Sequence, residues 1–106
     1  MRSRTPARQT ALMLAARHGA AQIVALLLAC RANVNLQDAS GNTALMCAAE
    51  HGHTQVACHL LARPELDLTL RDNDGKDPME VAKSAKQDAI VELIRQRIEH
   101  GHISDL

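Results

Sequence analysis

The stretch TALMLAARHG at residues 10–19 returns as TALMCAAEHG at residues 43–52, an offset of 33 residues. A weaker third copy, DPMEVAK, begins at Asp77 with an offset of 34, and the extra residue lies in the connecting segment 62–70. Self-similarity with a period near 33 is the pattern of a stacked repeat protein, in which each repeat is one supersecondary unit. The sequence therefore predicts three repeats packed into one domain.

Each copy carries the signals that start and stop a helix. Thr10, Thr43 and Asp77 stand where a side-chain oxygen caps a first turn, and Gly19 and Gly52 stand where a left-handed residue ends a helix. A second apolar segment at helical spacing follows in each copy, so each repeat is predicted to be a helical hairpin. These second segments are Ile23 to Leu28, Val56 to Leu61 and Ile90 to Ile94.

Two short connecting segments have the pattern of tight turns. DASG at residues 38–41 and DNDG at residues 72–75 both place Asp where it can bond its own turn and Gly where positive φ is tolerated. Residues 5–8 do not show this pattern, so the first repeat is expected to lack its own turn. We expect the two turns to protrude from the stack.

These motifs together resemble the ankyrin family, whose patterns T-P-L-H-x-A-A-x-x-G-H and L-L-L-x-x-G-A-D-V-N match across residues 10–76. The resemblance implies an all-α solenoid of about three helix-turn-helix repeats joined by protruding β-turns. The repeats would span residues 8–37, 38–71 and 72–98. Residues 1–7 would be a basic tail or a truncated repeat start, and residues 99–106 a C-terminal tail.

A narrower likeness concerns the C-terminal ankyrin repeats of the Kank family, and it lapses after Gly75. It implies an intracellular peptide as partner, such as a segment of a kinesin motor. The residues that carry it are Leu27 to Cys30, Val34-Asn35, Gln37-Asp38, Thr43 to Ala48 and Glu50 to His53.

The chain also departs from the ankyrin pattern. Arg31 and Lys86 replace helix-ending glycines, and at Arg31 we expect a left-handed backbone with a strain of about 1 kcal/mol. The second helix of the third repeat carries Glu92, Arg95 and Arg97 among its apolar residues. That polarity predicts a C-terminal cap.

Composition limits the function classes. The chain has twelve basic and twelve acidic residues and no Phe, Tyr or Trp, so neither a basic excess nor stacking aromatics indicate a nucleic-acid partner. The first residues have no apolar signal-peptide core, and the longest comparable apolar run, residues 23–30, is too short to span a bilayer. We expect reduced thiols, no membrane insertion and a cytoplasmic location.

Cysteine and histidine residues raise the alternatives of a zinc site or a Cys/His nucleophile, above all Cys47 with His51 four residues later. No paired C-x-x-C supplies a tetrahedral ligand set, and Cys47 occupies an apolar core position where a thiol stays protonated. Gly75-Lys76 lacks the remaining residues of a phosphate-binding loop. The sequence predicts no enzyme, no metal and no cofactor.

Ankyrin arrays are similar to one another in binding proteins on the concave face formed by turns and first helices. The resemblance thus implies another intracellular protein or peptide as partner. The alternatives are a structural spacer or fragment of a longer array and, less favoured, a hidden Cys/His or metal-dependent enzyme. The candidate binding residues are Arg17, His18, Gln37, Ala39, Ser40, Asn42, Glu50, His51, Arg71, Asn73, Asp74 and Lys76.

Two further expectations concern the first repeat and the last three residues. The apolar run Leu26 to Leu28 in the first repeat is unlike the polar face of a cap, so self-association through this uncapped repeat is expected. Ser104-Asp105-Leu106 fits the short pattern that PDZ domains capture at a chain terminus, with a plain tail as the alternative.

Overall fold

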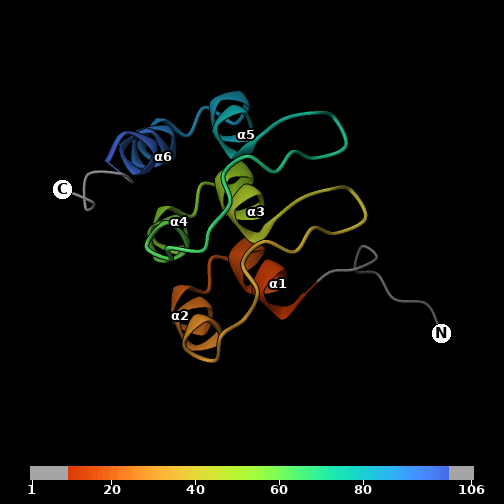
Figure 1. Ribbon diagram of the computed structural model, residues 1–106, viewed down its shortest axis with the longest axis vertical. Coiled ribbons are helices and arrows are strands. Elements are labelled where there is room, and N and C mark those ends of the chain that lie inside the picture. Colours follow the sequence, from red (N-terminus) through yellow and green to blue (C-terminus); the bar gives the residue numbers. More distant parts are fainter. Residues whose placement is uncertain (1–9, 101–106) are drawn as a thin grey trace.

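The computed structural model describes residues 10–100 of the chain, and these residues form six helices and no strand (Figure 1). Consecutive helices pair into three hairpins, which confirms the predicted all-α solenoid of three repeats. None of the described helices is long and apolar enough to cross a membrane. The helices are α1 (Ala11–His18), α2 (Ala21–Ala29), α3 (Ala44–His51), α4 (Thr54–Leu61), α5 (Pro78–Ser84) and α6 (Asp88–His100).

The first helix of each hairpin begins at the predicted cap. The hydroxyl of Thr10 accepts a hydrogen bond from the Met13 amide at 3.1 Å, and Thr43 does the same for Met46 at 3.3 Å. Asp77 forms a reciprocal capping box with Glu80. Local side-chain chemistry therefore fixes where α1, α3 and α5 start, as the sequence predicted.

Glycines end the first two of these helices. Gly19 has φ 73° and Gly52 has φ 74°, and the amide of each returns to carbonyls of the preceding turn. Arg31 and Lys86, which replace glycine after α2 and α5, adopt the same left-handed backbone with φ 67° and 60°. The expected left-handed geometry at Arg31 is confirmed.

The helices lie in two layers, with α1, α3 and α5 in one and α2, α4 and α6 in the other (Figure 1). Small residues on the inner sides, among them Ala16, Ala48, Ala49 and Ala82, are almost completely buried and let neighbouring helices approach closely. The main contacts run between adjacent hairpins, so the core is a continuous seam along the stack.

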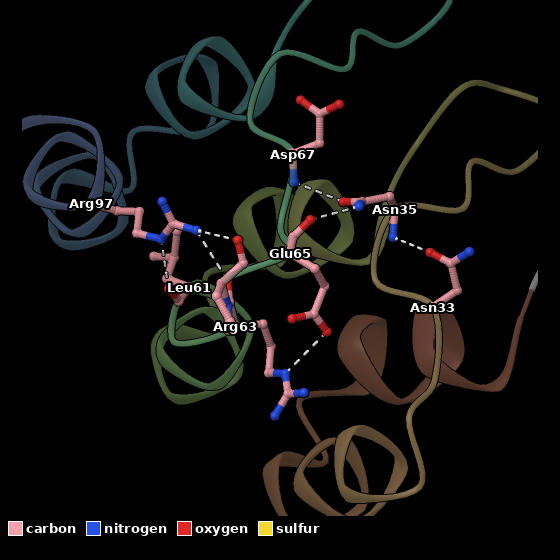
Figure 2. Close-up of polar contacts among 8 residues, drawn as sticks. Asn33, Asn35, Leu61, Arg63, Glu65, Asp67 and Arg97 are labelled. Carbon is pink, nitrogen blue, oxygen red and sulfur yellow. Dashed lines mark hydrogen bonds and ion pairs between the residues drawn. The ribbon is translucent and has the colours of Figure 1, made fainter. Parts of the chain in front are cut away.

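Two side chains join neighbouring hairpins through the segments that follow α2 and α4 (Figure 2). The amide group of Asn35 donates to the Glu65 carbonyl and accepts from the Asp67 amide, both at 2.8 Å. The Arg97 guanidinium, from α6, donates to the carbonyls of Leu61 and Arg63, both at 3.0 Å. Because α4 ends without a left-handed residue, Arg97 satisfies carbonyls that a glycine cap would otherwise serve.

The two ends of the stack differ in polarity. On α6, Arg95 forms ion pairs with Glu92 and Glu99 on the solvent side, in keeping with the predicted C-terminal cap. On α2, Ile23 and Leu26 are 52% and 66% exposed. The first hairpin thus presents apolar side chains where the last one presents charges.

Candidate functional site

Two tight turns project from the same side of the stack, next to α1, α3 and α5 (Figure 1). We call residues 38–41 the first finger and residues 72–75 the second finger. In the first, one carboxylate oxygen of Asp38 accepts from the amides of Ser40 and Asn42, both at 2.9 Å. In the second finger, Asp72 accepts in the same way from the amides of Asp74 and Lys76. The last residue of each finger is a left-handed glycine, Gly41 with φ 83° and Gly75 with φ 80°.

The fingers are tied to each other by two side-chain amides. Gln37 donates to the carbonyls of Gly41 at 2.9 Å and Arg71 at 2.8 Å. Asn73 donates its side-chain amide to Ala39 O and its backbone amide to Ser40 O, both at 2.9 Å. Of the candidate residues, Gln37 and Asn73 therefore also hold the finger backbones in place.

The second finger, α3 and α5 enclose a shallow hollow of about 330 Å³. It brings together four candidate residues, Asn42, Glu50, Asp74 and Lys76. Sequence reasoning missed the other four lining residues, Asp72, Val81, Ser84 and Ala85. Asp72 could have been included from the sequence, because it is the first residue of the turn pattern at residues 72–75. The remaining three line the hollow only because α5 stacks beside α3.

The remaining candidates lie outside the hollow. Ala39 and Ser40 are exposed on the first finger. Arg71 is exposed, donates to the Gly75 carbonyl at 2.9 Å and lies 3.9 Å from the carboxylate of Glu80. The first helices α1 and α3 contribute the last three, Arg17, His18 and His51.

A further residue outside the set of candidate binding residues is His53. Its Nε2 lies 2.9 Å from the carbonyl of Arg17, at the end of α1. Its ring stacks on that of His51 with centroids 6.1 Å apart, and a Cβ on Gly19 would come within 2.5 Å of it. His53 thus helps fix α1 against α3.

Cys47 does not have the environment of a nucleophile. Burial raises the pKa of its thiol above the ordinary value of 9.0, and the nearby Arg17 only partly opposes this. The side chain is 1% exposed, and His51 contacts the Cys47 carbonyl rather than the sulfur. Within residues 10–100, no group of three His, Cys, Asp or Glu side chains could hold a metal ion. The groups that the fingers and the hollow present are therefore suited to surface contacts and hydrogen bonds.

The comparisons with known proteins agree on one family. The family described as "Ankyrin repeats (3 copies)" matches residues 12–103. Rabankyrin-5 of Mus musculus is 37% identical over 89 residues, which is 84% of this chain and 8% of that protein, and rabankyrin-5 of Homo sapiens matches to the same extent. The chain thus spans only a small part of these relatives. Neither is a Kank protein, and the narrower likeness stays a prediction.

Proposed function

We propose that this chain, which belongs to the ankyrin-repeat family, binds another protein or a peptide on the side formed by its two fingers and its first helices. Ankyrin repeats are generally protein-interaction modules. The candidate residues on this side are the proposed contacts, with the hollow between the second finger, α3 and α5 as their centre.

The observation that carries the proposal is the bonding between the fingers. Gln37 and Asn73 connect the first finger to the second through main-chain atoms, so the backbone of this side is already ordered before a partner arrives. A surface that needs little ordering loses less conformational entropy on binding, which favours affinity. Among residues 10–100, the side formed by α2, α4 and α6 bears no comparable projecting turn (Figure 1).

The chemistry of the hollow suggests what it receives. Carboxylates of Glu50 and Asp74 line it together with the ammonium of Lys76, and Val81 and Ala85 add apolar surface. A partner side chain with an apolar stem and a cationic end, such as Lys or Arg, would match both features. We therefore propose a partner segment that inserts a basic side chain at this point.

The cellular setting is also part of the proposal. Cys30 and Cys58 are exposed and not disulfide-bonded, which suits the reducing environment of the cytoplasm. The partner would accordingly be an intracellular protein. A kinesin-motor segment, implied by the Kank likeness, is one candidate of this kind.

The test compares two folded variants on immobilised protein. The first changes Asn42, Glu50, His51 and Lys76 to Ala. The second, a matched control on the outer helices, changes four exposed residues of α4 and α6 to Ala: Gln55, His59, Asp88 and Gln96. Circular dichroism checks that both stay helical, since exposed positions normally change stability by under about 0.5 kcal/mol each.

Quantitative mass spectrometry then identifies proteins that wild type and control retain and the first variant loses. Such a protein, confirmed by titration with the purified partner, supports the proposed surface. A partner retained by the first variant and lost by the control would move the site to the outer helices. Specific capture by none of the three would favour the alternative of a spacer in a larger array.

A further inference from the structure

The first helices of the hairpins carry charges of opposite sign at the same repeat position. Arg17 is the seventh residue of α1, and Glu50 is the seventh residue of α3. The equivalent residue of α5 is the neutral Ser84. Because α1, α3 and α5 lie side by side in one layer, these three positions form a row along the stack (Figure 1). The sign of the charge therefore changes once along the row, between α1 and α3.

The surroundings of Arg17 place it on the side formed by the fingers and the first helices, here called the finger side. Glu50 lines the hollow together with Val81, the fourth residue of α5. The fourth residue of α3 is Cys47, and the Arg17 guanidinium lies beside its thiol. Arg17 is thus related to Cys47 as Glu50 is related to Val81, one repeat further along the stack.

Arg17 lacks an ionic partner inside the fold. Arg63, Arg71 and Arg95 each form an ion pair with a carboxylate. Within residues 10–100, no carboxylate forms an ion pair with Arg17. Its thiol neighbour is only a weak hydrogen-bond acceptor, whereas a guanidinium has five N–H donors. Arg17 is also half-buried, so its side chain loses less freedom when a carboxylate binds it.

The first finger has a single carboxylate, that of Asp38, and it is engaged elsewhere. One of its oxygens accepts the amides of Ser40 and Asn42, which fixes its orientation within the finger. Asp38 lies near enough to act on the Cys47 thiol but forms no ion pair with Arg17 among the described residues. A carboxylate that pairs with Arg17 therefore has to come from outside the fold.

We propose that the partner segment carries an acidic side chain that pairs with Arg17, next to the basic side chain that enters the hollow, an inference that rests on the proposed function. Carboxylates bind guanidinium groups through two parallel hydrogen bonds, which adds geometric specificity. The acidic residue would lie over α1 and the basic residue at α3 and α5. The opposite placement would bring like charges together at both positions, so the order of the two charges decides the direction in which the segment runs.

The spacing of the two charges follows from helix packing. Packed neighbouring helices lie about 8–10 Å apart. A polyproline II segment rises about 3.1 Å per residue and returns to the same face after three residues, so charges three residues apart span about 9 Å. In a helical segment, residues seven apart lie on one face and span about 10.5 Å. The partner should therefore hold an acidic and a basic residue at a separation of three or of seven.

The test selects peptides on the immobilised full chain from a phage-displayed library of random sequences long enough to hold either separation. Wild type and the control Arg31→Gln, which changes an exposed arginine after α2, should enrich peptides with both charges at one of the two separations. Arg17→Gln should keep the preference for the basic residue and lose that for the acidic one. Arg17→Glu should select a second basic residue in place of the acidic one.

Titration with a selected peptide then measures the contact itself. Arg17→Gln should weaken binding roughly fivefold, the upper range for an exposed charge pair. Neutralising the acidic residue of the peptide should weaken binding to the same extent, and the two changes together should cost no more than either alone. Such coupling separates a direct pair from a purely structural role of Arg17. Circular dichroism checks that the variants stay helical, and if Arg17→Glu does not fold, Arg17→Gln decides.

The results that overturn this pairing differ from those that overturn the proposed function. Selected peptides that the variant with Asn42, Glu50, His51 and Lys76 changed to Ala fails to bind support the finger side. If those peptides show no acidic preference, or if Arg17→Gln selects the same sequences, the pairing is wrong and the proposed function stands. Peptides that the four-alanine variant still binds, or no enrichment at all, would overturn both.

Discussion

Replacing Asn35 with Ala should destabilise the fold although the residue lies near the surface. The change removes two hydrogen bonds that link the segment after α2 to the segment after α4, at Glu65 O and Asp67 N (Figure 2). Each such bond contributes roughly 0.5–1.5 kcal/mol, and the exposed Glu65 carbonyl can bond to water instead, so we expect a loss of about 1–2 kcal/mol. For a domain of this size that corresponds to a Tm lower by roughly 5–15 °C.

Thermal and urea unfolding followed by circular dichroism measure the effect. The matched control is Asn33→Ala, because the Asn33 side chain accepts a local bond from the Asn35 amide at 2.9 Å and, among residues 10–100, bonds to no other repeat. We expect this control to cost less than the Asn35 variant. If the two variants unfold within about 0.5 kcal/mol of each other, the cross-repeat bonds contribute nothing and the reasoning is wrong.

Two further predictions concern a finger and a thiol. Gly41→Ala should destabilise the fold more than Gly75→Ala. Both glycines have a left-handed backbone, but of the two only Gly41 would bring its new Cβ against other backbone atoms, those of Asp72 and Asn73 at 2.8 Å. Equal Tm values for the two variants would contradict this. In native protein Cys30 and Cys58 should react with a thiol reagent while Cys47 reacts only on unfolding. Since burial raises the pKa of Cys47, its contribution to stability should be complete below pH 9 and decline above it; rapid native labelling of three thiols would contradict burial.

The starts and ends of the helices were predictable because they depend on neighbours in sequence. Thr10, Thr43 and Asp77 cap helices by bonding amides three residues away, and the conformation of Arg31 follows from its place after a helix. Such contacts are present in the sequence pattern itself.

The links between repeats could not be predicted in the same way. Arg97 caps α4 from 36 residues away, and Asn35 reaches a segment 30 residues further along. The sequence analysis interpreted Arg97 only as part of the polar face of a cap and Asn35 only as part of a family likeness, and it predicted neither contact. The lining of the hollow by Val81 and Ala85 likewise depends on how α5 sits against α3, which no local pattern specifies.

The bonds that hold the two fingers have a consequence for how this surface can evolve. Each of them ends on a main-chain atom, and the side chains that supply them belong to Gln37, Asn73 and the finger aspartates. The side chains of Ala39, Ser40 and Asp74 supply none of these bonds. On the proposed binding side, specificity for a new partner could therefore change through substitutions at those three positions while the backbone that carries them stays the same.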